Sequence, residues 1–144
     1  MDNIDDPFTK LDEVIEQIKI EHGKHTIIVD VHGESTSEKM AIGHYLDGKV
    51  TAILGTHTHV PTADLQILKK GTFYQTDLGM CGDYDSVIGM KKEECIQKFT
   101  KKFIKTRLEP ANGEGTLCGT IINVDKEMRV SEFKQIFKGG RLNS

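Results

Sequence analysis

Apolar residues dominate two short runs in the first half of the chain, at 26–31 and 50–54. Runs of this length are typical of buried strands. The segment between them has helical signals, with Ser35 placed to cap a helix and Asp47-Gly48 placed to end it. A strand, helix, strand unit normally brings its two strands together in parallel through a right-handed crossover. The pattern therefore predicts a βαβ unit and an α/β fold.

The hydrophobic pattern on either side of this unit predicts further elements. Behind Asp6-Pro7, four apolar residues recur at helical spacing and predict a surface helix: Leu11, Val14, Ile15 and Ile18. A late amphipathic helix is predicted over Lys91–Thr106. Short apolar runs predict two hairpins, one from strands 65–68 and 72–76 and one from strands 116–124 and 129–137. We expect α/β (α+β) architecture in a single domain over residues 1–144.

Histidines follow both of the first two apolar runs. His32 ends the first run, and His57 and His59 lie in the segment Gly55–Val60 after the second. Because the carboxyl ends of parallel strands meet at one edge of a sheet, we expect these imidazoles to lie close together. On an extended backbone, His57 and His59 would share one face at about 6–7 Å. Neutral imidazole is the commonest metal ligand, so the pattern favours metal binding over surface histidines in a turn.

Two polar segments would lie near this edge of the sheet. Glu34 and Ser35 open the predicted helix next to His32, where the helix N-terminus favours a phosphate group, and simple helix capping is the alternative. The loop 77–90 contains three glycines and three acids, and loops of this length are often functional. Solvated turn acids are the alternative there. The loop adds three candidates for a position beside the substrate phosphate: Asp77, Gly79 and Asp83.

Composition narrows the functional classes. The chain has 144 residues and a net charge of −3, with a pI near 6.1, so we expect no nucleic-acid partner. It contains no apolar run of the roughly 20 residues that span a membrane, so we expect no membrane association and a cytoplasmic location. The three cysteines lack CxxC spacing, which argues against a disulfide framework and a zinc ribbon.

Taken together, the motifs resemble the C-terminal half of the calcineurin-like metallophosphoesterases, in the bacterial branch of 2′,3′-cyclic-nucleotide 2′-phosphodiesterases. The matching segments, in chain order, are Asp5-Asp6-Pro7-Phe8, Val29-Asp30-Val31-His32, Ser35-Thr36-Ser37-Glu38-Lys39, Gly55-Thr56-His57-Thr58-His59-Val60, Thr62-Ala63-Asp64, Asp77-Leu78-Gly79-Met80, Asp83-Tyr84-Asp85 and Gly89-Met90. The resemblance implies a β-sandwich flanked by helices, with a two-metal site of iron, manganese or zinc. It also implies that His32 and His57 hold one metal and that His59 holds the other.

The chain departs from that family in one respect. The family's N-terminal half carries a Glu-Asn pair and a Gly-Asn-His motif, and neither occurs in residues 1–144. These residues provide the bridging carboxylate and the histidine that acts on the leaving group. We therefore expect a half-enzyme that is inactive alone, is completed by a separate N-terminal chain and self-associates into a homo-oligomer. The alternatives are a non-catalytic remnant and a metal-binding module without hydrolase activity.

Overall fold

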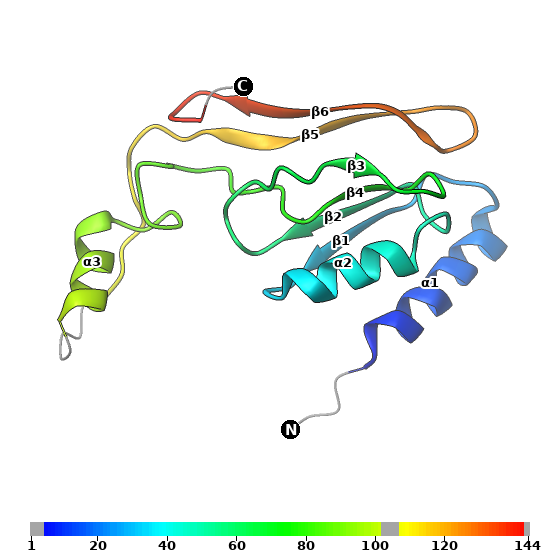
Figure 1. The fold of residues 1–144 in the computed structure, drawn as a ribbon, viewed down its shortest axis with the longest axis horizontal. Helices are drawn as coiled ribbons and strands as arrows, with labels where there is room; N and C mark the ends of the chain where they lie inside the picture. Colours follow the sequence, from blue (N-terminus) through cyan, green and yellow to red (C-terminus); the bar gives the residue numbers. More distant parts are fainter. Residues whose placement is uncertain (1–4, 102–106, 143–144) are drawn as a thin grey trace.

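The computed structural model describes residues 5–101 and 107–142 (Figure 1). Within these residues the elements are α1 (Pro7–His22), β1 (Ile28–His32), α2 (Thr36–Tyr45), β2 (Ala52–Thr56), β3 (Gln66–Ile67), β4 (Phe73–Gln75), α3 (Lys92–Thr100), β5 (Leu117–Val124) and β6 (Val130–Lys138). None of the helices in this part of the chain is both long and apolar enough to cross a membrane.

The main sheet has the strand order β1-β2-β4-β3. Strands β1, β2 and β4 are parallel, and β3 pairs antiparallel with β4. The predicted βαβ unit is therefore confirmed, as are the β3–β4 hairpin and the long β5–β6 hairpin. In the parallel pair, Ile28 lies opposite Ala52 and His32 lies opposite Thr56. This register brings the ends of β1 and β2 level.

The fold has three layers, with the main sheet in the middle (Figure 1). Helices α1 and α2 pack on one face, where Ile15 and Leu46 join a buried cluster with Ile53 and Tyr74 of the sheet. The β5–β6 hairpin covers the other face, where the buried core residues are Ala52, Phe73 and Val130. The two sheets and the outer helices confirm the predicted α/β fold class.

Helix α3 stands apart from the three layers (Figure 1). It ends at Thr100, and Lys101 has an extended backbone with φ −118° and ψ 114°. The prediction of one continuous helix over Lys91–Thr106 is therefore wrong at Lys101, and its last part lies outside the described residues. Short helices depend on the packing of an apolar face for their stability. Phe99 remains 84% exposed here, so that packing is weak in the described chain.

Candidate active site

Two imidazoles meet at the carboxyl edge of the main sheet. His32 is the last residue of β1, and its register partner Thr56 is the last residue of β2. His57 follows Thr56, so the two histidines come to lie side by side. His57 Nδ1 is 3.2 Å from His32 Nε2, and the ring centroids are 5.0 Å apart at an interplanar angle of 77°. Both side chains are exposed.

A hydrogen-bond chain beneath His32 fixes the tautomer of its ring. The Thr56 hydroxyl donates to Asp30 Oδ1 at 3.1 Å, and Thr56 Oγ1 is 3.1 Å from His32 Nδ1. A hydroxyl has only one hydrogen, so Thr56 must accept from the His32 Nδ1–H. The lone pair of His32 Nε2 is therefore turned outward, toward His57. Such an outer carboxylate and hydroxyl commonly orient a histidine that binds a metal.

The spacing of the two ring nitrogens fits a shared divalent cation. Two imidazole nitrogens bound to one tetrahedral zinc at about 2.0–2.1 Å would lie roughly 3.3 Å apart. The distance between His57 Nδ1 and His32 Nε2 is 3.2 Å. In this structure the His57 Nδ1–H donates a hydrogen bond to the His32 Nε2 lone pair, and a bound ion would replace that hydrogen bond. The pair could thus supply two ligands to one ion. Among residues 5–101 and 107–142, no group of three or more His, Cys, Asp or Glu side chains is placed to hold a metal ion. The described chain accordingly offers a pair of ligands rather than a complete set.

His59 faces a different neighbour. The expectation of an extended His57–His59 segment is wrong, because β2 ends at Thr56 and the two histidines have φ values of 128° and 64°. The turn arises because the Thr58 N–H donates to the buried Asp77 Oδ2 at 2.8 Å. His59 Nδ1–H then donates to the carbonyl of Ile88 at 2.9 Å. This bond leaves the lone pair of the neutral ring on His59 Nε2.

Asp77 is a buried anchor for the histidine loop. Its side chain is fully buried and accepts from the Gly79 N–H at 2.9 Å as well as from Thr58. Lys39, which is only 1% exposed, pairs with Asp77 Oδ2 at 3.2 Å and also donates to the carbonyl of Thr56. Burial alone would raise the pKa of Asp77, but the hydrogen bonds from Thr58, Gly79 and Lys39 hold that pKa below its usual value.

Lys39 is a contributor to the site that the sequence analysis missed. It lies on α2 at the same helical face as Ile42 and Leu46, which are buried. The i, i+3, i+7 spacing of these positions was the signal that could have found it, because a lysine within a buried stripe must have a buried acceptor. The lysine joins the end of β2 to the loop that follows β4.

The residues at the start of α2 are arranged as a helix cap. Ser35 Oγ accepts from the Glu38 N–H at 3.3 Å and lies 2.9 Å from Ser37 Oγ. This confirms Ser35 as the N-cap of α2. Glu34 is exposed next to it. Both lie two to three residues beyond His32, so the amino end of α2 is at the same edge as the histidine pair.

Gly79 and Asp83, two of the predicted loop residues, support the backbone conformation of the loop after β4. Gly79 has φ +82°, and a Cβ there would lie 2.7 Å from the Tyr84 hydroxyl and 2.9 Å from Pro61. Asp83 accepts from the Asp85 N–H at 2.7 Å and from the Gly113 N–H at 3.1 Å. These contacts tie the loop after β4 to the segment before β5. The geometry thus groups His32 with His57, and places Gly79 and Asp83 in the supporting loop.

The family of this chain follows from its similarity to known proteins. Residues 1–136 match the family described as YmdB-like protein. The chain belongs to this family. It is 48% identical over 128 residues to a Bacillus subtilis (strain 168) protein named 2′,3′-cyclic-nucleotide 2′-phosphodiesterase, a match that covers 88% of this chain and 47% of that protein. The family resemblance predicted from the motifs is confirmed.

Solved structures share the fold of this YmdB-like chain. A hypothetical protein from Thermus thermophilus superposes with a TM-score of 0.84 at 40% identity, covering 98% of this chain and 54% of that one. A protein described as a novel phosphatase from Mycoplasma pneumoniae gives a TM-score of 0.83 at 40% identity, covering 93% and 47%. The chain therefore spans about half the length of these relatives.

Proposed function

We propose that this YmdB-like chain forms one side of a metal-dependent phosphodiesterase centre acting on cyclic-nucleotide-type phosphodiesters. His32 and His57 are the ligands of one divalent ion, and His59 is a ligand of a second. The observation that carries the proposal is the 3.2 Å separation of His57 Nδ1 and His32 Nε2, with the His32 lone pair turned toward the shared position. The phosphodiesterase name of the Bacillus subtilis relative supports the substrate class.

In this proposal, the residues at the carboxyl edge of the main sheet have separate roles. Divalent ions such as iron, manganese or zinc would polarise the phosphoryl oxygens and activate water for attack. The chain's own residues orient the ligands: Thr56 holds the His32 ring, and the Lys39–Asp77 pair holds the turn that carries His57. The amino end of α2, capped by Ser35 and next to Glu34, presents the positive partial charge of its backbone N–H groups at the edge where a substrate phosphate would lie.

The remaining ligands are proposed to come from polypeptide outside residues 1–144. The described residues bring two histidines together and no third donor, whereas zinc normally takes four ligands and a catalytic site uses three from protein. The relatives are about twice as long as this chain. We expect residues 1–144 alone to lack hydrolase activity and to bind one ion weakly. A further N-terminal segment, on the same or a separate chain, completes the centre.

Metal titration of the chain tests the assignment of ligands. Isothermal titration with Zn²⁺ and Mn²⁺ should show binding that is lost in His32→Ala and in His57→Ala. His44→Ala is the matched control, because His44 is an exposed histidine on α2. His44→Ala should bind like the parent chain. Equal loss in the control, or unchanged binding in His57→Ala, would contradict the proposed ligands.

A further inference from the structure

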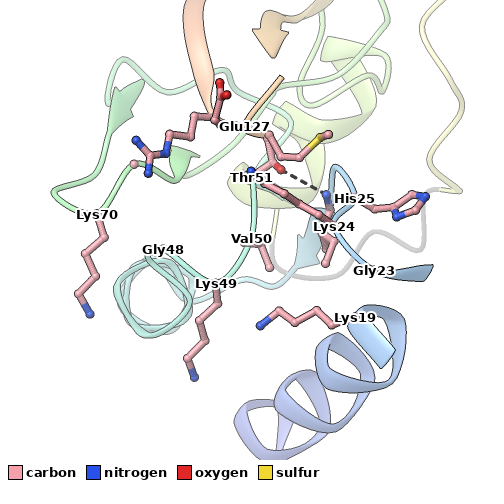
Figure 2. Close-up of a pocket in the computed structure, with 14 residues that line it drawn as sticks. Lys19, Gly23, Lys24, His25, Gly48, Lys49, Val50, Thr51, Lys70 and Glu127 are labelled. Atoms are coloured by element: carbon pink, nitrogen blue, oxygen red, sulfur yellow. Dashed lines mark hydrogen bonds between the residues drawn. The ribbon is translucent and has the colours of Figure 1, made fainter. Parts of the chain in front are cut away.

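A cavity of about 480 Å³ lies at the opposite edge of the main sheet from the histidine pair. It sits where β1, β2 and β4 begin, at Ile27, Thr51 and Gly71. The histidines sit where β1 and β2 end, and a five-residue strand separates the two edges by roughly 13 Å. Four connections that are distant in sequence form its walls (Figure 2): the end of α1 with the segment before β1, the loop before β2, the β3–β4 turn and the β5–β6 turn.

The walls of this cavity are strongly basic. Although the whole chain has a net charge of −3, only one carboxylate, that of Glu127, lines the cavity among the described residues. The cations that line it are Lys19, Lys24, Lys49, Lys70 and Arg129. Figure 2 shows the side chains of Lys49 and Lys70 extending in the same direction from two different loops. The local charge is thus opposite to that of the molecule.

Intramolecular partners account for only part of this positive charge. Lys19 pairs with Glu16 at 3.2 Å and lies in the last turn of α1, where it offsets the negative end of the helix dipole. Lys49 pairs with Asp12 at 2.7 Å. The other three cations, Lys24, Lys70 and Arg129, form no ion pair within the described part of the chain. These three therefore remain for an external anion.

The cavity also has apolar wall and open space. Ile27, Val50 and Met128 line it beside the cations. At Gly23 and Gly71, which both have positive φ, an added Cβ would meet nothing within 4 Å, so the turns leave room at the rim. A volume near 480 Å³ falls in the range of small-molecule sites. Basic side chains beside an apolar wall suit a small organic molecule that carries a phosphate group.

We propose that this cavity is a second, anion-binding site that recognises the phosphate group of a small phosphorylated molecule. Lys24, Lys70 and Arg129 bind the phosphate oxygens, and the apolar wall receives the remainder of the ligand. The phosphate could belong to a nucleoside monophosphate or be inorganic phosphate, because both present the same dianion. This site is independent of the proposed phosphodiesterase centre, since it uses none of the residues at the histidine edge.

The test is calorimetric titration of the chain at low ionic strength with EDTA present, which keeps metal away from the histidines. The probes are adenosine monophosphate, inorganic phosphate and uncharged adenosine. We expect saturable binding of the phosphate-bearing probes and none of adenosine. Tighter binding of adenosine monophosphate than of phosphate would assign the site to nucleotides, and equal binding would assign it to free phosphate.

Variants decide whether the cavity is the binding site. The Lys24→Gln, Lys70→Gln and Arg129→Gln substitutions should each weaken binding about five- to tenfold, as expected for a charge-assisted hydrogen bond. Lys134→Gln is the matched control, since Lys134 is an exposed lysine on β6 outside this cavity. It should bind like the parent chain. Absence of saturable binding, or equal weakening by Lys134→Gln, would overturn the proposal whatever the histidine site does.

Discussion

At the scale of single residues, the histidine site depends on the buried ion pair between Lys39 and Asp77. The pair is 3.2 Å apart and almost completely buried, and it connects α2, the end of β2 and the loop after β4. Asp77 also accepts a hydrogen bond from the Thr58 N–H, and this bond turns the backbone between His57 and His59. A charge left alone at this position has no water to solvate it, so each partner needs the other.

Removing one partner should therefore destabilise the chain strongly. We expect Asp77→Ala to lower the free energy of unfolding by about 3–5 kcal/mol, because Lys39 is left buried and unpaired. Urea denaturation measures this change. The double variant Lys39→Met/Asp77→Leu removes both charges and should cost less than the single Asp77→Ala substitution. A double variant that is less stable than the single one would contradict this account of the pair.

The same pair predicts a dependence of stability on pH. Hydrogen bonds hold the pKa of Asp77 below its usual value in the folded chain. The folded state therefore binds that proton less readily than the unfolded state, whose aspartate pKa is about 3.9. The stabilisation that ionised Asp77 contributes is complete above the unfolded-state pKa. It is lost as the pH falls through the lower, folded-state pKa. Unfolding free energies measured from pH 7 to pH 2 should fall more steeply for the parent than for Asp77→Asn, and parallel curves would refute the assignment.

Individual residues show where sequence reasoning works and where it stops. His32 and His57 were predicted to meet because each lies at the carboxyl end of a strand of one βαβ unit, and strand ends are set by local patterns. The orientation of His59 could not be predicted, because it depends on a hydrogen bond from Thr58 to a residue 19 positions away. Lys39 was missed because a lysine is usually a surface residue.

At the scale of elements, the close approach of β2 to the end of β4 shapes the site. Gly55 lies in β2, and a Cβ at this position would be 1.7 Å from the carbonyl oxygen of Thr76. Only glycine allows the two backbones to come this near. The approach also brings the Leu78 N–H to the Gly55 carbonyl at 2.9 Å, which fixes the start of the loop after β4.

A methyl group at Gly55 should force the strands apart. We expect Gly55→Ala to destabilise the chain by about 3 kcal/mol or more, because the clash is with backbone and cannot be relieved by a side-chain rotation. Gly119→Ala on β5 is the matched control, since its nearest neighbour would be 4.0 Å from the added Cβ. Thermal unfolding should separate the two variants, and a Gly55→Ala protein as stable as Gly119→Ala would contradict the close approach.

Helix α3 presents an apolar face outward, and we propose that this face takes part in the self-association expected from the sequence. Ile96 is 55% exposed and Phe99 is 84% exposed. We expect Phe99→Ser to change the free energy of unfolding by less than about 0.5 kcal/mol, since the ring is mostly exposed among the described residues. Sedimentation velocity should show weaker self-association for Phe99→Ser than for Glu93→Ser, a control on the same helix. The same degree of association in both variants would remove α3 from the interface.

The elements differ in how far the sequence determined them. Helix α1 was predicted from its apolar spacing behind Asp6-Pro7 and α2 from its capping and ending signals, and their N-caps are Asp6 and Ser35. The extent of α3 was overestimated, because its amphipathic pattern continues past Thr100 whereas Lys101 already has an extended backbone. A periodic pattern indicates a helix only as far as packing supports it.

At the scale of the whole molecule, the chain has the layers of its relatives over about half of their length. Strand β1 lies at one end of the main sheet and pairs only with β2 among the described strands. Ile28 on this strand is 52% exposed. A parallel strand at an open edge can accept a further strand, and parallel sheets are normally covered on both faces. The histidine pair lies at the end of this open strand, where added polypeptide could bring the missing ligands.

The most direct test of the account is hydrolysis of bis-p-nitrophenyl phosphate by residues 1–144 with added Mn²⁺, with metal content measured by elemental analysis. His57→Ala is assayed in parallel. We expect no turnover above the His57→Ala background and less than one bound ion per chain, because two histidines make only part of a coordination set. Turnover that disappears in His57→Ala would contradict this expectation, since residues 1–144 would then assemble a working centre without further ligands.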